Sequence, residues 1–324
     1  MVTIRCAGAF SVLPARGDRE EIAVTWDLTA IGDLAADLVL VDPDAPMQPG
    51  REILVRDCGL SLGGATGILA AAASRLGLRV RMVGRVGDDG LGRFILGELA
   101  AAGVDIAMVA RGATERTAVT VAVAERGERA LLTYSGTIAT FAGTDVPEAA
   151  LRETRHVHIS SYYLQIALQR DVPRLLRAAR AAGATTSLDT GDDPANRWES
   201  GIADALAEVD LFFPNEREAA HLGGFEDLAR QIGCVALKQG GAGASLSLPN
   251  GLRLTRAAFP VVAIDTTGAG DVFNAGYLAA MLRGSDPAEC LRWACAGGAL
   301  ATTWPGGQGP GLTPARIEEV LRDG

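Results

Sequence analysis

Short apolar runs and segments with helical periodicity alternate along most of the chain. The apolar runs, each bounded by polar or turn residues, are Leu28–Ile31, Val80–Val83, His156–Ile159, Thr186–Leu188, Leu211–Phe213 and Val235–Leu237. The segments with helical spacing are Ala65–Leu76, Gly92–Ala102, Arg170–Ala182, Trp198–Glu208, Glu216–Leu222, Val272–Leu282 and Pro287–Thr303. Continuous apolar strands that alternate with helices are typical of a doubly wound, mostly parallel sheet. Ligands of such a sheet bind at the carboxyl ends of its strands.

A second pattern, in which apolar and polar residues alternate, predicts strands of a different kind. It occurs over Glu52–Asp57, Ala118–Ala124 and Ala130–Tyr134, and the last two are joined as a hairpin. These segments predict a small sheet, built from parts of residues 38–62 and 113–134, that acts as a lid. An open apolar face on such a lid favours pairing of two copies, so we expect a homodimer.

Composition and charge narrow the classes of function. The chain has 324 residues, is 48% hydrophobic, and carries a net charge of −9 with scattered basic residues, which argues against a nucleic-acid surface. It has no apolar stretch of about 20 residues and no export signal, so we expect neither a membrane span nor secretion. Its five cysteines form no C-x-x-C pair, which favours a reducing, cytoplasmic setting. Residues 1–25 have weak periodicity and are expected to form an arm before a single domain over 26–324.

The run Asp265–Asp271, with the sequence D-T-T-G-A-G-D, is the most informative segment and directly precedes a helical pattern. Small residues at a helix start leave backbone N–H groups and the positive end of the helix dipole open to an anion such as a phosphoryl group. Phosphoryl transfer also needs a carboxylate that accepts the proton of the attacking hydroxyl, and Asp271 lies beside the turn. By itself, the same run also fits an ordinary helix N-cap that follows a tight turn.

This run resembles the D-T-x-G-A-G-D signature of the ribokinase-like carbohydrate kinases, the PfkB family, and the similarity continues at Phe273, Asn274 and Gly276. Gly84–Gly92 resembles the family's G-x-V-G-x-D-x-x-G pattern, and Gly63-Gly64 precedes a helix as in the family. The resemblance covers residues 26 to 315. It implies a three-layer α/β/α fold with a β-sheet lid, and an ATP-dependent, Mg²⁺-dependent transfer of the γ-phosphoryl group to a hydroxyl of a sugar or sugar-like molecule.

The resemblance also implies roles for individual residues near the transferred group. It makes Asp271 the general base, and it makes Gly268, Ala269 and Gly270 the anion hole. Asp37 matches the carboxylate that binds substrate hydroxyls, and Gly63 and Gly64 match backbone that lies close to the substrate.

On the nucleotide side, the resemblance implies contacts from Asn215, Glu218, Lys238, Gly240, Gly243, Thr266 and Cys295. Glu218 would hold Mg²⁺ through water, and Asp265, Thr267 and the turn near Gly306 would bind a monovalent cation such as K⁺. Without the resemblance, Asn215 and Glu218 also fit an ordinary helix start with an acidic first turn, and Lys238 also fits a solvated lysine.

Departures from the family pattern leave the substrate open. Ile68 stands where the family usually has an asparagine that faces the sugar, so a nucleoside kinase of the same fold is an alternative. Members that act on 2-keto-3-deoxygluconate use arginines near the positions of Ser135 and Asp193, which favours a neutral polyol here, although Arg197 leaves an acid open. A non-catalytic sugar- or nucleotide-binding protein is a further alternative.

Other motifs carry weaker hypotheses. Gly59–Gly63 matches the G-x-S-x-G pattern of a hydrolase nucleophile elbow, but the segment before it alternates, unlike the buried strand that such an elbow follows. The only lysine, Lys238, is followed by Gln239, so there is no Walker A sequence. His156 and His158 are two residues apart on a predicted strand but lack a third metal ligand at a usual spacing.

Overall fold

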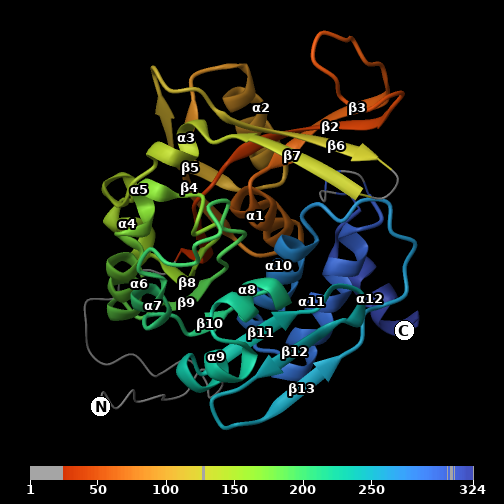
Figure 1. Ribbon diagram of the computed structural model, residues 1–324. Coiled ribbons are helices and arrows are strands. Elements are labelled where there is room, and N and C mark those ends of the chain that lie inside the picture. The colour runs from red at the N-terminus through yellow and green to blue at the C-terminus, as the bar shows by residue number, and fades with distance from the viewer. Residues whose placement is uncertain (1–24, 126–127, 305, 307–308, 310, 324) are drawn as a thin grey trace.

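The computed structural model describes residues 25–125, 128–304, 306, 309 and 311–323 (Figure 1). The N-terminal arm predicted over residues 1–25 therefore lies, except for Thr25, outside the described residues. Within the described part of the chain, no helix is long and apolar enough to span a bilayer.

A nine-stranded sheet forms the centre of the molecule. Across the sheet the order is β13 (Arg253–Arg256), β12 (Ala244–Ser247), β11 (Cys234–Lys238), β10 (Leu211–Phe212), β9 (Thr185–Leu188), β8 (Thr154–Ile159), β1 (Trp26–Ile31), β4 (Val80–Gly87) and β5 (Asp105–Gly112). The strands from β11 to β5 pair in parallel, and β12 and β13 add an antiparallel edge. The predicted mostly parallel sheet is confirmed. Strands β12 and β13 were missed because polar residues interrupt their apolar pattern, and β5 was missed although its residues 106–110 form an apolar run.

Helices cover both faces of this sheet, as predicted (Figure 1). One core contains residues of α1 (Ala65–Arg75), α2 (Gly90–Ala101), α10 (Ala269–Leu282), α11 (Pro287–Ala301) and α12 (Pro314–Asp323). The other contains residues of α4 (Glu148–Arg152), α5 (Ile166–Gln169), α6 (Val172–Ala181), α7 (Ile202–Leu206), α8 (Glu216–His221) and α9 (Phe225–Gln231). The strands supply both cores by alternation: in β1, Leu28 and Ala30 join the first core and Ile31 the second. A further short helix, α3 (Gly136–Thr140), and two 3₁₀ turns, Gly143–Asp145 and Gly240–Ala242, complete the fold.

Helix α10 lies at backbone distance from α11. A Cβ added to Gly276 would be 2.7 Å from the carbonyl oxygen of Trp293, so only glycine allows this approach. At the other end of the contact, Cβ atoms added to Gly297 and Gly298 would lie 3.1 Å and 3.3 Å from the carbonyl oxygens of Val272 and Ala269. The first turn of α10 is therefore supported from behind by α11.

A separate four-stranded mixed sheet lies above α1 and α10 in Figure 1, in the order β3 (Val55–Gly63), β2 (Ala35–Pro43), β6 (Ala118–Glu125) and β7 (Glu128–Tyr134). The lid segments predicted at 38–62 and 113–134 overlap all four strands. The strand predicted at Glu52–Asp57 was wrong in its bounds, because β3 begins at Val55 and continues to Gly63. Residues 55–60 of β3 are all exposed, so neither side of this stretch carries a buried apolar pattern.

The helix predicted over Trp198–Glu208 was also too long, because α7 spans only Ile202–Leu206. Trp198 and Ser200 have left-handed φ values of 55° and 73°, which a helix does not allow. The Asp193 carboxylate holds this loop by accepting hydrogen bonds from three backbone N–H groups, those of Ala195, Arg197 and Trp198. A local side-chain acceptor thus competes successfully with helix formation.

We expect Gly276→Ala to lower the free energy of unfolding by about 1–3 kcal/mol, because the new Cβ must push α10 away from Trp293. Gly97→Ala is the matched control: it lies in α2 with open space around the new Cβ, and should raise stability by about 0.5–1 kcal/mol. Urea denaturation of both variants measures the difference. Equal effects would show that the α10–α11 contact can widen freely.

Candidate active site

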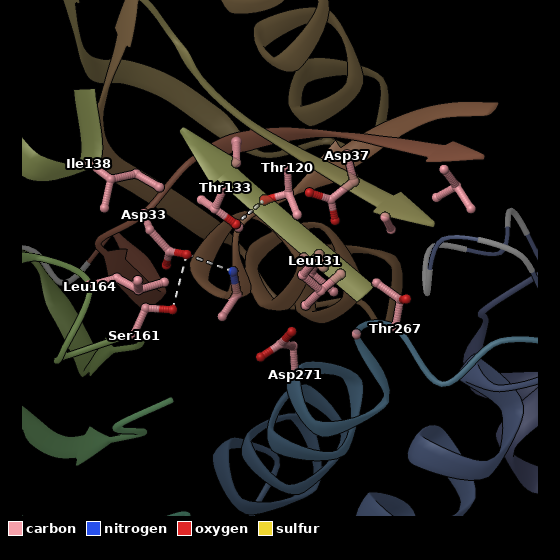
Figure 2. Close-up of a pocket in the computed structure, with 17 residues that line it drawn as sticks. Asp33, Asp37, Thr120, Leu131, Thr133, Ile138, Ser161, Leu164, Thr267 and Asp271 are labelled. Atoms are coloured by element: carbon pink, nitrogen blue, oxygen red, sulfur yellow. Dashed lines mark hydrogen bonds between the residues drawn. The ribbon is translucent and has the colours of Figure 1, made fainter. Parts of the chain in front are cut away.

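A cavity of about 210 Å³ lies between the four-stranded sheet and the loops at the carboxyl ends of the central strands (Figure 2). Its lining residues are Asp33, Ala35, Asp37, Val39, Gly64, Ala65, Ile68, Thr120, Ala122, Leu131, Thr133, Ile138, Ser161, Leu164, Thr267, Gly268 and Asp271. Of the predicted site residues, Asp37, Gly64, Thr267, Gly268 and Asp271 therefore share one space, although they come from distant parts of the chain. Figure 2 shows Asp37 and Asp271 entering this space from opposite sides.

Asp37 depends on Gly63, which lies diagonally across from it on the neighbouring strand. Asp37 lies on β2 and is 8% exposed, and β2 pairs with β3 so that Ala35 is opposite Gly63. A Cβ on Gly63 would come within 2.1 Å of the Asp37 Oδ1 atom, so the carboxylate occupies the space that a larger residue would fill. Gly64 follows with φ 77° and begins α1, where a Cβ would be 2.8 Å from the Asp33 carbonyl oxygen. Gly63 thus makes room for Asp37, and Gly64 makes room for the backbone of Asp33 and Ala35.

Asp33, which sequence reasoning did not assign, ties three parts of the cavity wall together. Its Oδ1 accepts hydrogen bonds from Thr66 N at 3.0 Å and Thr66 Oγ1 at 2.6 Å, and its Oδ2 from Ala65 N at 2.9 Å and Ser161 Oγ at 3.0 Å. Ser161 has φ 51°, a left-handed value that a serine keeps only where its surroundings impose it. The signal that could have found Asp33 is that α1 starts at Gly64, which has no side chain to cap it, so an acceptor must come from elsewhere.

The D-T-T-G-A-G-D run leads into α10, which begins at Ala269, three residues before the predicted start at Val272. Gly268 is the N-cap residue, with a left-handed φ of 70°. Asp265 fixes the turn: its Oδ1 accepts from Thr267 N at 2.9 Å and Thr267 Oγ1 at 2.7 Å, and its Oδ2 accepts from Gly306 N at 2.8 Å. The C-terminal segment at Gly306 and the start of α10 are therefore joined through one carboxylate.

Asp271 lies in the first turn of α10 and lines the cavity. Burial raises the pKa of its carboxyl well above the ordinary value, and the carboxylates of Asp189, Asp33 and Asp37 add to this rise. Lys238 opposes the rise without cancelling it. The group is consequently a stronger base than an exposed aspartate.

Lys238 forms a buried ion pair with Asp189, a residue that the sequence did not single out. The Lys238 Nζ is 2.5 Å from Asp189 Oδ2, and the two side chains are only 14% and 6% exposed, so the solvated-lysine alternative is wrong. Burial alone would lower the pKa of Lys238, but the Asp189 and Glu218 carboxylates raise it above the ordinary value. Burial alone would likewise raise the pKa of Asp189, but the Lys238 ammonium lowers it. Both groups are thus charged at neutral pH.

Asn215 and Glu218 form a reciprocal capping box at the start of α8. Glu218 N donates to Asn215 Oδ1 at 2.9 Å, while Glu218 Oε2 accepts from Asn215 N at 2.8 Å and Oε1 from Asn215 Nδ2 at 2.7 Å. Burial, reinforced by the nearby Asp189 carboxylate, raises the pKa of Glu218 to about 7. The ordinary helix-start interpretation therefore accounts for these contacts, and a direct metal ligand is not needed to explain them.

The remaining predicted nucleotide residues lie outside the cavity lining. Gly240 begins a 3₁₀ turn, and Gly243 follows it with φ 102°, where a Cβ would be 2.0 Å from the Arg256 carbonyl oxygen. Thr266 is exposed before α10. Cys295 is buried in α11, and burial raises the pKa of its thiol to about 11.

The weaker motifs find structural explanations. Ser61 lies within β3 opposite Asp37, not at a strand-to-helix turn, so the hydrolase elbow is wrong. His156 and His158 do share one face of β8, but both rings hydrogen-bond Ser187 Oγ, at 2.6 Å and 2.7 Å. Burial lowers the pKa of the two histidines to about 3 and about 4, so both are neutral. Among the described residues there is no group of three or more side chains suited to a metal ion.

Comparison with known proteins places this geometry in a family. Residues 26–314 match the pfkB family carbohydrate kinases. The chain is 33% identical over 284 residues to an ATP-dependent ribose-1-phosphate kinase of Halopiger xanaduensis, covering 86% of this chain and 88% of that protein. It is 28% identical over 298 residues to a ribokinase of Haemophilus influenzae, covering 87% and 94%. It is also 28% identical over 279 residues to a nucleoside kinase of Methanothermobacter thermautotrophicus, covering 83% and 87%.

Solved structures share the fold. A protein described as ribokinase II from E. coli superposes with a TM-score of 0.81 at 24% identity, covering 92% of this chain and all of that one. Adenosine kinase from Sinorhizobium meliloti gives 0.80 at 21% identity, covering 92% and 99%. Ribokinase from Arabidopsis thaliana, solved with ribose and ATP, gives 0.76 at 23% identity, covering 92% and 99%. The predicted ribokinase-like fold is confirmed, and the chain belongs to the pfkB family of carbohydrate kinases.

Proposed function

We propose that the protein transfers the γ-phosphoryl group of ATP to a hydroxyl of a sugar or sugar-like alcohol, with Asp271 as the general base. The observation that carries this proposal is that the Asp271 and Asp37 carboxylates enter one cavity beside the turn that begins α10. The names of two relatives support the choice of reactants: one is an ATP-dependent kinase of a ribose phosphate, and one was solved with ribose and ATP.

The residues around the turn fit a nucleotide phosphate. Gly268 and Gly270 leave the backbone open, and a Cβ on Gly270 would lie 3.5 Å from the Lys238 Nζ, so the ammonium and the turn can face the same anion. The predicted anion hole, Gly268, Ala269 and Gly270, would thus act together with Lys238. On the same side, Asn215, Gly240, Gly243, Thr266 and Cys295 are the further nucleotide contacts that the resemblance implies.

The residues around the turn could hold two metal ions, Mg²⁺ and a monovalent cation. Mg²⁺ would supply positive charge to the nucleotide phosphates when bound. Both Glu218 oxygens already accept hydrogen bonds from Asn215, so a contact between Glu218 and Mg²⁺ would run through water, as the sequence suggested. Asp265 and Thr267 would hold a monovalent cation such as K⁺ near Gly306.

In the proposed reaction, Asp271 removes the proton of the acceptor hydroxyl as its oxygen bonds to the γ-phosphorus. The bond from this phosphorus to the bridging oxygen then breaks and ADP leaves. The raised pKa of Asp271 suits this task, because a base accepts a proton more readily when its pKa approaches the operating pH. The four-stranded sheet, which supplies Asp37 and Leu131 to the cavity, would exclude water as a lid.

The cavity lining favours a neutral acceptor. Asp37, Thr120 and Thr133 offer polar contacts, and the residues that the structure places around the cavity include no lysine or arginine that could pair with a substrate phosphate. An acceptor such as ribose 1-phosphate is therefore disfavoured. The apolar side chains Ile68, Ile138 and Leu164 form the rest of the wall, and they make a nucleoside the second candidate.

The small sheet would also join two copies of the chain. Leu60, Leu132 and Tyr134 on its strands are 45%, 54% and 53% exposed. Exposed apolar side chains on one sheet favour a homodimer through the lid.

Asp271→Asn should lower kcat at least about 100-fold with little change in substrate affinity, because the amide cannot accept the hydroxyl proton. ADP release measures kcat, and a panel of ribose, fructose, tagatose, 2-keto-3-deoxygluconate, ribose 1-phosphate and nucleosides, with K⁺ present, identifies the substrate. Turnover close to wild type would refute the role of Asp271. If no alcohol in the panel causes ADP release but a sugar binds, a non-catalytic binding protein is favoured.

The pH profile should show the raised pKa of Asp271. The base must be unprotonated, so kcat/KM should fall as the pH decreases through this pKa, well above the range where an ordinary aspartate titrates. Initial rates between pH 4 and 9 test this, with ATP kept saturating. A profile that stays flat down to the ordinary aspartate range contradicts a buried base.

Asp37→Ala should weaken sugar binding much more than nucleotide binding, because the lost carboxylate lines the cavity opposite Asp271, where we propose that the sugar binds. Calorimetric titrations of sugar and of ATP, done separately, compare the two affinities. Asp42→Ala is the control, since Asp42 lies on the same strand in a surface pair with Arg56. An unchanged affinity for sugar would remove Asp37 from the substrate site.

A further inference from the structure

The chain contains 30 basic residues, and 29 of them are arginine, so the one lysine stands out. Lys238 lies at the end of β11, with its Nζ between the Asp189 carboxylate at 2.5 Å and the first turn of α10, where a Cβ on Gly270 would be 3.5 Å away. A planar guanidinium is larger than an ammonium and needs a fork of acceptors. The confined position thus suits the compact ammonium group of lysine and not the larger guanidinium group of arginine.

Asp189 is itself held firmly. Its Oδ2 accepts from Asn274 Nδ2 at 2.7 Å as well as from Lys238, and its Oδ1 accepts from Gly191 N at 2.9 Å. Asn274 lies on α10, three residues after Asp271. The Asp189 carboxylate thus connects the ends of β9 and β11 with the helix that carries the proposed base.

The ammonium has competing partners. Lys238 interacts electrostatically with Asp189, Glu218 and Asp271, and Asp271 in turn is influenced by Asp33 and Asp37. Without Asp189, the flexible lysine side chain would be drawn toward the remaining carboxylates, Glu218 and Asp271, since opposite charges attract strongly where water is excluded. An ion pair with Asp271 would occupy the group that must accept a proton.

We propose that Asp189 is a positioning residue that holds the Lys238 ammonium against the Gly268–Gly270 turn and away from Asp271. In this arrangement the ammonium faces the transferring phosphoryl group, while the base stays available. The inference rests on the proposed function, since it assigns the transferred group to that turn. Asn274 supports it by fixing the Asp189 carboxylate from α10.

A double-mutant cycle tests whether Asp189 acts through Lys238. Lys238→Met should lower kcat about 10- to 100-fold, and Asp189→Asn should lower it by a similar factor with little change in sugar KM. The double variant D189N/K238M should match K238M alone, because Asp189 then has no ammonium left to position. Removing both charges also avoids leaving one of them buried and unpaired, so the double variant keeps the test valid if D189N folds poorly.

A spectroscopic readout makes the test independent of turnover. Because the chain has one lysine, selective ¹³C,¹⁵N-lysine labelling gives a single lysine side-chain signal in NMR spectra of the full-length protein. Addition of a non-hydrolysable ATP analogue with Mg²⁺ should shift this signal in the wild type, and D189N should change both its free position and its response. Asp192→Asn is the control: Asp192 forms an exposed pair with Arg217, and its loss should leave signal and kcat unchanged.

The outcomes separate the inference from the proposed function. A further loss of kcat in D189N/K238M relative to K238M, or a D189N signal that responds as in the wild type, would overturn the positioning role even if Asp271→Asn abolishes turnover. If no alcohol is phosphorylated but the lysine signal responds to the analogue and D189N removes that response, the proposed function fails while the positioning of Lys238 stands.

Discussion

The first turn of α10 depends on a backbone-to-backbone contact behind it. Glycines on both helices, Gly276 on α10 and Gly297 and Gly298 on α11, let the helices meet with no side chain between them. Close-packed interiors do not deform gradually, so the turn at Gly268 keeps one position relative to α11. The groups that lie against this turn, such as Asp265 and Lys238, therefore contact a helix start whose position is fixed by α11.

Near this turn, several carboxylates lie close to one positively charged side chain, Lys238. Asp189, Glu218 and Asp271 interact with a single ammonium, and Asp33 and Asp37 act on Asp271 in turn. The surroundings of these carboxylates differ. Asp33 is committed to four hydrogen bonds from the protein and Asp189 to the lysine, whereas burial raises the pKa of Asp271 and Glu218. Like charges at close range force such a division, because they cannot all remain ionised without partners. Asp33, with four hydrogen bonds from the protein, supports the cavity wall, whereas Asp271 is the carboxylate that we propose as the base.

Sequence patterns predicted the parts of this arrangement that are local. Apolar runs located the buried parallel strands, and the D-T-T-G-A-G-D run located the turn and Asp271, because short-range geometry and composition determine both. The pairing of Asp189 with Lys238 was missed, since the two residues are 49 positions apart and meet only when β9 and β11 join the same sheet. The loop at Trp198 was misjudged as helix because Asp193 competes for its backbone N–H groups, a contact that helical periodicity does not reveal.

The position of a polar residue along a strand separates structure from chemistry in this fold. His156 and His158 lie within β8, where Ser187 pairs with both rings, and burial keeps them neutral. Asp33 and Ser161 come just after the ends of β1 and β8, where the backbone leaves the sheet, and both line the cavity. A buried polar group within a strand must find its partners inside the protein. A polar group beyond the end of a strand can also form hydrogen bonds with a ligand, and the cavity lies at the carboxyl ends of the parallel strands, where such groups occur.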